Sequence, residues 1–556
     1  MKLKVPRLVA GVGVTLAVVA PLGLLVYQSF LSAPFFDPQA TLGLEAYQYI
    51  FTSGDFHRAF LSSFAVSLGM TAIALPLGSL LGFLVARTDL PGKKWLEPWL
   101  LVPVFLSPVV LAFGFVVAVG PVGFFSLWAK ALVGSVPWNL YSLVGLIVIA
   151  GLTHVPHVFI YVSAALRGLD PAVEEAARVT GAGPWRIAFS VSLPLVRPAI
   201  LFSGALVFLL GFELFGLPLV LGDPAGLLVL TTYLYKLTNL LGVPSYQLMA
   251  VVAVSIVAIT FPLVYFQRRM IGAAARYAVI GGKGRAFRPL ALGPLRWPML
   301  ALVILWLLSV VALPLAGIAL RSVVRNWGEG VVLSEVLTLD HFRELLQYPN
   351  LVRGIANTLA IGALGGVLAV AIYALIALSA HRAKGIWPAW LDYLSLVPRA
   401  LPGLVVGLAF FWLFLFVKPI APLRTTLVSL WLAYSVVWLA YGLKLITATL
   451  MQVAPDLEDA ARVTGAGPAK IARDVTLPLI RFGLIGSWLL IFMMFVREYS
   501  TGVYLLGPGT EVIGSLIVSL WGTGALDLIS ALSVVEVVIV GAALLAALRL
   551  GVRLDA

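Results

Sequence analysis

About twelve long apolar segments divide the chain, and they constrain its fold more than any other feature of the sequence. Each has roughly 20 or more residues with few charges, the length that a helix needs to cross a bilayer. They lie near residues 8–31, 60–86, 96–120, 141–166, 199–222, 247–267, 298–320, 354–380, 388–417, 426–450, 483–506 and 528–549. Hydrophobic residues make up 61% of the 556 residues and charged residues 11%, which excludes disorder and a soluble multi-domain enzyme. The sequence therefore predicts an all-α membrane protein with about twelve transmembrane helices.

Basic residues gather between alternate apolar segments and give the chain a net charge of +13. Most of them lie on the side that carries the N-terminus, and basic loops mark the cytoplasmic face of a membrane. We therefore expect a multi-pass protein of the cell (inner) membrane, surrounded by lipid, with both termini in the cytoplasm. The excess charge is interpreted as membrane orientation, with no nucleic acid as a partner. The chain has no cysteine, which excludes disulfides and thiolate metal sites.

One segment occurs twice in the chain. Residues Glu174 to Pro184 recur as Glu458 to Pro468, 284 positions later, with one conservative change. Each copy lies between the fourth and fifth apolar segments of a set of six, so the two sets are parallel repeats. The basic stretch between the sets contains Gly and Pro and is expected to be a cytoplasmic linker. The predicted organisation is a six-helix half at 1–270 with a loop at 167–198, a linker at 271–297, and a second six-helix half at 298–556 with a loop at 451–482.

The repeated loop has the features of a short helix that another protein could contact. Pro171 suits a helix start, and Gly181 can end the helix in a left-handed conformation. Ala176 and Ala177 keep one face small, and Arg178 could reach a carboxylate on a partner. An interfacial helix that rests on lipid headgroups is the alternative. Because lipid contact requires no matching residue order, the repetition favours a protein partner that is present twice.

Both copies also follow one longer pattern, Glu-Ala-Ala, three residues, Gly, nine residues, a β-branched residue, one residue and Leu-Pro. Its residues are Glu175, Ala176, Ala177, Gly181, Val191, Leu193 and Pro194 in the first copy, and Asp459, Ala460, Ala461, Gly465, Val475, Leu477 and Pro478 in the second. The pattern resembles the cytoplasmic signature of the membrane subunits of ATP-binding-cassette (ABC) importers, although Asp459 shortens the reach of the usual Glu. The resemblance implies the type I ABC importer permease fold in a fused two-half form, with coupling helices seated on ATPase subunits. The implied ATPase-coupling residues are Glu174, Glu175, Ala176, Ala177, Arg178 and Gly181, and Glu458, Asp459, Ala460, Ala461, Arg462 and Gly465.

The fused layout, the basic linker and the stretch Phe495 to Gly507 resemble the ferric-iron branch of these permeases. The resemblance implies import of ferric iron, delivered by a solute-binding protein outside the membrane. It also implies a homodimeric ABC ATPase in the cytoplasm, which binds ATP and Mg. No cofactor is expected in this chain, and no enzymatic activity, because it lacks the motif Gly-x-x-x-x-Gly-Lys-Ser/Thr. Import of thiamine, polyamine or phosphonate by the same mechanism is an alternative. An ion-coupled secondary transporter is the alternative from another class, although it has no use for two identical docking loops.

Ionisable residues inside the spans are the candidates for the translocation path, since each costs free energy in a bilayer unless it is paired or hydrated. Glu213 and Glu498 occupy equivalent places in their halves. They could form a cation-attracting ring near the outer gate, or each could be buried against a neighbouring span. Arg497 adjoins Glu498, and Arg399 in the ninth span is a candidate partner for one of the acids.

Two histidines lie three residues apart in the fourth span. The spacing of His154 and His157 would suit a metal ion, because it puts both on one helix face. Pro156 lies between them and no third ligand is evident, so hydrogen bonding at a helix kink is the favoured interpretation. The sequence therefore assigns no metal ligands.

Overall fold

The computed structural model describes residues 4–238, 244–274, 289–383, 385–399 and 401–551. In these residues the chain forms helices and three isolated β-bridges, with no strand. The helices of the first half are α1 (Lys4–Ser29), α2 (Glu45–Thr52), α3 (Gly54–Arg87), α4 (Lys93–Phe105), α5 (Pro108–Val119), α6 (Phe124–Val133), α7 (Leu143–Arg167), α8 (Pro171–Val179), α9 (Pro184–Ile187), α10 (Leu193–Leu195), α11 (Arg197–Glu213), α12 (Leu230–Lys236) and α13 (Tyr246–Ala274). Those of the second half are α14 (Arg296–Leu307), α15 (Leu313–Ser322), α16 (Asp340–Gln347), α17 (Pro349–Ala360), α18 (Gly366–Ala380), α19 (Ile386–Arg399), α20 (Gly403–Phe416), α21 (Leu427–Val437), α22 (Leu439–Leu450), α23 (Pro455–Val463), α24 (Pro468–Ile471), α25 (Leu477–Val496), α26 (Ile513–Thr523) and α27 (Leu526–Arg549).

The number of membrane spans agrees with the prediction. Among the described residues, nine helices are long and apolar enough to cross a membrane, and three bent helix pairs raise the number to as many as twelve. Several spans are broken inside the predicted ranges: α5 begins anew at Pro108, and α11 ends at Glu213 before a π-helical turn at Pro218–Gly222. Proline lacks a backbone N–H, so it interrupts the hydrogen bonds of a helix. Irregular backbone at this depth is tolerated where other parts of the protein bury it.

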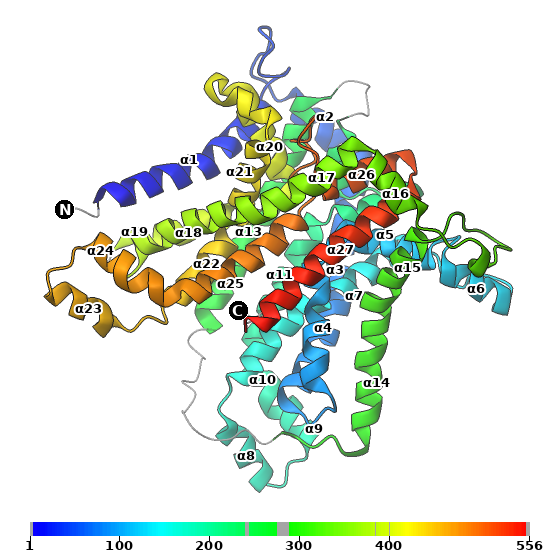
Figure 1. Cartoon of the computed structure of the whole chain (residues 1–556), viewed down its shortest axis with the longest axis horizontal. Coiled ribbons are helices and arrows are strands. Elements are labelled where there is room, and N and C mark those ends of the chain that lie inside the picture. The colour runs from blue at the N-terminus through cyan, green and yellow to red at the C-terminus, as the bar shows by residue number, and fades with distance from the viewer. Residues whose placement is uncertain (1–3, 239–243, 275–288, 384, 400, 552–556) are drawn as a thin grey trace.

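The first span of each half packs against the other half. α1 lies against α18, α19 and α20 of the second half, and α15 lies against α5 of the first (Figure 1). Gly114 of α5 makes the second contact close, since a Cβ at this position would lie 2.7 Å from the carbonyl oxygen of Pro314. Small residues at helix crossings of this kind let two backbones approach each other in a membrane. The two halves are therefore interlocked rather than only adjacent.

The two repeated loops project from the same side of the molecule. In Figure 1, α8 and α23 lie at its lower and left edges, on the side of the N-terminal end of α1 and away from α2 and α16. The predicted linker falls largely outside the described residues, which resume at residue 289. There, Leu290 donates a backbone hydrogen bond to Arg87 (2.9 Å) and accepts one from Asp89 (3.2 Å), so the chain returns to the end of α3.

Candidate functional site: the coupling loops and an intramembrane polar layer

The two repeated loops adopt the same backbone conformation. The helices α8 and α23, which are the predicted coupling helices, are both followed by a glycine in the left-handed region, with φ of 80° at Gly181 and 84° at Gly465. The next residue in each copy donates to a carbonyl five residues earlier, Ala182 to Ala177 and Ala466 to Ala461, both at 3.1 Å. These are the contacts of a helix C-terminal cap, for which glycine is preferred because it has no Cβ. The glycines of the motif therefore stop each coupling helix at the same residue.

The first glutamate of each copy is buried rather than available to a partner. Glu174 is 2% exposed and Glu458 is 4% exposed. Ser192 donates to Glu174 at 2.7 Å, and Thr476 at the corresponding position donates to Glu458 at 2.9 Å. Both acids thus hold their coupling helix against the segment that leads into the next span.

An arginine at the end of the second span of each half completes this contact. Arg87 Nε lies 3.4 Å from Glu174 Oε1, and Arg382 Nη1 lies 2.9 Å from Glu458 Oε2. His381 Nε2 also lies 3.2 Å from Glu458 Oε1. The first half has no histidine at the corresponding position, so only the second half has this contact. Sequence reasoning did not find these bases, because they lie far from the loops along the chain.

The other predicted coupling residues lie nearer the surface. Ala176, Ala460, Asp459 and Arg462 are exposed, and the last two form an ion pair with each other. Glu175, Ala177 and Arg178 are half-buried, and Glu175 and Arg178 make contacts within the chain. Ala461 is also half-buried, and Gly465 is exposed. The acid that the family motif names, Glu175 or Asp459, is therefore the more accessible of the two neighbouring acids in each copy.

Each coupling helix also presents apolar side chains to the surroundings. Val179 is 89% exposed, and Val463, at the corresponding position, is 88% exposed. Val173 and Leu457 form a second exposed pair at matching positions. Isolated exposed apolar residues are common, but here the same positions are exposed and apolar in both diverged halves.

Glu498 lies in the turn after α25 and its carboxylate is fully engaged. Oε1 accepts hydrogen bonds from Ser500 Oγ (3.0 Å), Thr501 N (3.1 Å) and Thr501 Oγ1 (3.0 Å). Oε2 accepts one from Trp438 Nε1 at 3.3 Å, at the break between α21 and α22. These contacts join the ends of two spans within the second half.

Glu213 lies at the equivalent end of α11 in a different environment. It is half-buried, and its Oε1 atom has no hydrogen-bond partner among the described residues. Arg399, at the end of α19, lies within electrostatic reach of it, as the sequence suggested. The two acids that look equivalent in the sequence thus differ in how their charge is satisfied.

The turns that follow the two acids meet between the halves. Tyr499 Oη accepts a hydrogen bond from the backbone N–H of Gly216 at 2.7 Å. The rings of Phe215 and Tyr499 stack, with centroids 6.0 Å apart and planes 9° apart. Gly216 allows this close approach, since a Cβ would lie 2.6 Å from the Tyr499 hydroxyl oxygen and one of the two groups would have to shift. The structure therefore brings the neighbourhoods of Glu213 and Glu498 together across the chain.

Arg497 and a third acid, Glu536, complete a group of charged residues inside the spans. We call Glu213, Arg399, Arg497, Glu498 and Glu536 the intramembrane polar layer. The Arg497 guanidinium lies 5.9 Å from the centroid of the Trp438 ring and within electrostatic reach of Glu536. Glu536 lies in α27, is 1% exposed, and neither carboxylate oxygen has a hydrogen-bond partner in the described part of the chain. The sequence analysis missed it, although an acid inside an apolar span is a signal that could have identified it.

The two histidines lie on either side of Pro156 in α7, which is one continuous helix. His154 Nδ1 lies 2.7 Å from the Ala150 carbonyl oxygen, and its ring stacks on that of His157 at 5.2 Å. Pro156 cannot donate to Leu152, and Trp306 of α14 donates to that carbonyl instead, at 3.2 Å. The described residues contain no group of three His, Cys, Asp or Glu side chains that could hold a metal ion.

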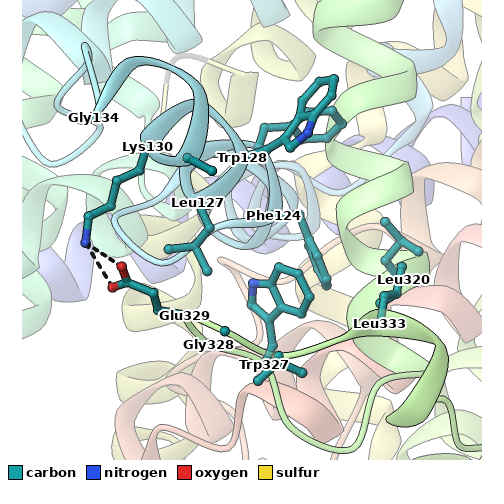
Figure 2. Close-up of a pocket in the computed structure, with 14 residues that line it drawn as sticks. Phe124, Leu127, Trp128, Lys130, Gly134, Leu320, Trp327, Gly328, Glu329 and Leu333 are labelled. Carbon is teal, nitrogen blue, oxygen red and sulfur yellow. Dashed lines mark hydrogen bonds and ion pairs between the residues drawn. The ribbon is translucent and has the colours of Figure 1, made fainter.

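A pocket of about 540 Å³ lies between α6 and the loop after α15 (Figure 2). The rings of Phe124 and Trp327 lie 4.3 Å apart, and Lys130 pairs with Glu329 at 2.9 Å. Trp327 Nε1 donates to the Val122 carbonyl at 3.1 Å. The pocket is therefore a further place where the two halves contact each other, and none of the predicted site residues lines it.

The chain belongs to the family of binding-protein-dependent transport system inner membrane components, whose model matches residues 74–272 and again 372–556. It is a type I ABC importer permease in a fused two-half form, which confirms the expected fold class and family.

Among curated relatives, it is 24% identical over 472 residues to the ferric transport system permease protein FbpB of Actinobacillus pleuropneumoniae, a match that covers 83% of this chain and 65% of that protein. It is also 24% identical over 493 residues to the putative ferric transport system permease protein FbpB 1 of Haemophilus influenzae, covering 87% of this chain and 74% of that protein. The molybdenum transport system permease protein ModB of Escherichia coli is 33% identical over 159 residues, 29% of this chain and 69% of ModB.

Proposed function

We propose that the chain is the membrane subunit of an ATP-driven importer of ferric iron. The two FbpB relatives align with most of this chain, and both are described as ferric transport permeases. A solute-binding protein would deliver iron on the outer side, and a homodimeric ABC ATPase, which binds ATP and Mg, would act on the cytoplasmic side. The chain itself would need no cofactor and catalyse no reaction. Both termini would lie in the cytoplasm, because the loops on that side carry most of the positive charge.

The observation that carries this proposal is the duplicated, matching surface of the coupling helices. Val179 and Val463 are exposed to almost the same degree at corresponding positions of two halves that otherwise differ. A homodimer of ATPases offers two identical grooves, and each coupling helix would fill one of them. The ATPase-coupling roles of the half-buried Glu175 and Arg178, and of the exposed Asp459 and Arg462, rest on the same argument.

The intramembrane polar layer would form the translocation path. Glu213 is the acid best suited to attract a cation there, because one of its carboxylate oxygens has no hydrogen-bond partner in the described residues. Glu498 would act more by holding the turn after α25 in place, since its oxygens already accept four hydrogen bonds. Arg399 and Arg497 would limit how much positive charge the layer accumulates.

These two arginines also support a second candidate, the import of an oxyanion. Guanidinium groups are well suited to bind phosphonate or molybdate oxygens. The putative 2-aminoethylphosphonate transport system permease protein PhnU of Salmonella typhi is 30% identical over 212 residues, which cover 36% of this chain. Thiamine or a polyamine would use the same mechanism.

The proposal is tested by purifying the chain from its native membrane after mild crosslinking and identifying the co-purifying proteins by mass spectrometry. We expect an ATPase and a solute-binding protein, the latter containing iron by elemental analysis. Phosphonate or molybdate in the binding protein would favour the second candidate. Reconstituted vesicles that accumulate solute without ATP would overturn the importer mechanism in favour of ion-coupled transport.

A further inference from the structure

In each half, the arginine at the end of the second span donates a hydrogen bond to the coupling loop, and the two acceptors occupy corresponding positions. Arg87 Nη2 donates to the carbonyl of Leu169 at 3.1 Å, and Arg382 Nη2 donates to that of Val453 at 3.1 Å. Leu169 and Val453 directly precede the N-cap residues of the two coupling helices. We call the groups Arg87, Leu169, Glu174 and Ser192 the first latch, and Arg382, Val453, Glu458 and Thr476 the second latch.

Each latch fixes the coupling loop at three places. The arginine holds the residue before the helix, the glutamate lies within the helix, and the hydroxyl lies in the π-helical segment that follows it. A buried ion pair contributes little net stability, whereas removing one partner leaves an uncompensated buried charge. The arrangement is therefore better suited to fixing a position than to stabilising the fold.

The two arginines reach the same contacts from different backbones. Arg87 is the last residue of α3, whereas Arg382 follows α18 with φ of 52°, the only positive φ at a non-glycine residue in the described part of the chain. A residue with a Cβ rarely adopts this conformation, and such strain persists where the surroundings impose it. Because the backbones differ and the contacts agree, the contacts are what the two halves have in common.

We propose that each latch makes a span move together with its coupling helix when the ATPases close. The first latch connects α3 to α8, and the second connects α18 to α23. α3 packs against α11, which ends at Glu213, and α18 packs against α25, which precedes Glu498. The first contact is close, because Gly211 of α11 lies against the backbone of Ser67. Motion at the coupling helices thus has a continuous, packed route to both acids of the polar layer. The role in transport rests on the proposed function, whereas the rigidity of the latches does not.

The two latches differ in their access to solvent. The side chain of Arg87 is 2% exposed, whereas that of Arg382 is 31% exposed. Arg382 and His381 also line a cavity of about 800 Å³ at the ends of α18 and α22. Water can screen the second pair and not the first, so loss of the first latch has the larger effect.

The rigidity is tested on the full chain in lipid nanodiscs without an ATPase. The chain has no cysteine, so spin labels can be introduced at two exposed positions alone, Leu68→Cys on α3 and Val179→Cys on α8. Pulsed electron resonance then measures the distribution of distances between them. Glu174→Gln and Ser192→Ala should broaden it, whereas Ser192→Thr, which copies the second latch, should keep the original width. Arg186→Gln, at an exposed position on α9, is the matched control.

The transmission is tested in the assembled transporter by measuring solute imported per ATP hydrolysed. Glu174→Gln should lower this ratio at least about fivefold, the lower end of typical coupling between sites, while assembly and ATP hydrolysis persist. An unchanged distance distribution in Glu174→Gln and Ser192→Ala would overturn the latch. A broadened distribution with an unchanged ratio would overturn the transmission. If no ATPase associates with the chain, the proposed function fails, and with it the transmission, while the distance measurement still decides the latch.

Discussion

Replacing Glu498 by glutamine tests whether this acid holds the fold together. The substitution keeps the shape of the side chain and removes its charge. The carbonyl oxygen of glutamine can still accept from Ser500 and Thr501, which donate to Oε1 at 3.0–3.1 Å. The amide nitrogen, however, takes the place of Oε2 and faces the indole N–H of Trp438, so that two donors meet.

The magnitude follows from these contacts. One hydrogen bond is lost and a buried donor is left unsatisfied, which costs about 1–3 kcal/mol. The three remaining hydrogen bonds lose the extra strength that a charged acceptor gives, a further cost of the same sign. We therefore expect a destabilisation of about 2 kcal/mol or more. Taking each kcal/mol as roughly 2 °C for a unit of about 250 residues, the unfolding midpoint should fall by about 4 °C or more.

Glu213→Gln is the matched comparison. One Glu213 oxygen is buried without a hydrogen-bond partner in the described residues, so removing the charge relieves a desolvation cost. We expect the midpoint to stay the same or rise, while the transport rate falls because the path loses its available negative charge. The two variants thus separate a structural acid from a transport acid.

The assay is thermal unfolding of both purified variants in one detergent, followed by intrinsic fluorescence, beside the unmodified chain. Binding-protein-dependent uptake into vesicles is measured in parallel. An unchanged midpoint in Glu498→Gln together with a lowered midpoint in Glu213→Gln would refute the reasoning, because the hydrogen bonds would then not determine which acid supports the fold.

Three further predictions concern one helix crossing, one ion pair and one exposed surface. Gly114→Ala should loosen α15 from α5, since the new Cβ would lie 2.7 Å from the Pro314 carbonyl oxygen; size-exclusion chromatography that shows an unaltered sharp peak would contradict this. The pKa of Glu511 is lowered from 4.5 to about 2, chiefly by the hydrogen bond from Arg353, so the contact stabilises fully above pH 4.5 and is lost as the pH falls toward 2; the unfolding midpoint of Glu511→Gln should lack this acid dependence. Val463→Asp places a charge on the exposed apolar surface of α23 and should reduce recovery of the ATPase on co-purification, and equal recovery would count against that surface as the docking site.

Much of the architecture was predictable because its signals are local. A run of about 20 apolar residues specifies a span whatever its neighbours are. The breaks at Pro108 and after Glu213 were less predictable. Prolines mark where a helix is interrupted, whereas the direction of the chain after the break depends on which residues bury the freed backbone groups. The exchange of first spans between the halves has no sequence signal of its own, since both faces of α1 and α15 read as apolar.

The candidate site shows the same division. The repeated motif located both coupling loops, yet Glu174 and Glu175 are neighbours of one type, and only their burial separates the latch residue from the accessible acid. Glu213 and Glu498 were likewise equivalent by position and are unlike in hydrogen bonding. Glu536 was not predicted, although a carboxylate within an otherwise apolar span is a signal that the sequence contains.

The sequence by itself determined that this chain is a duplicated membrane permease with one loop present in two copies, because hydrophobic length and repeated residue order are properties of short stretches of chain. Only the tertiary structure decided which charges are satisfied and by what. Arg87 reaches Glu174, Arg382 reaches Glu458 and Trp438 reaches Glu498 across long intervals of sequence. Burial raises the cost of an unpaired charge, so it is the packing of distant helices that satisfies Glu498 and leaves one oxygen of Glu213 without a hydrogen-bond partner among the described residues.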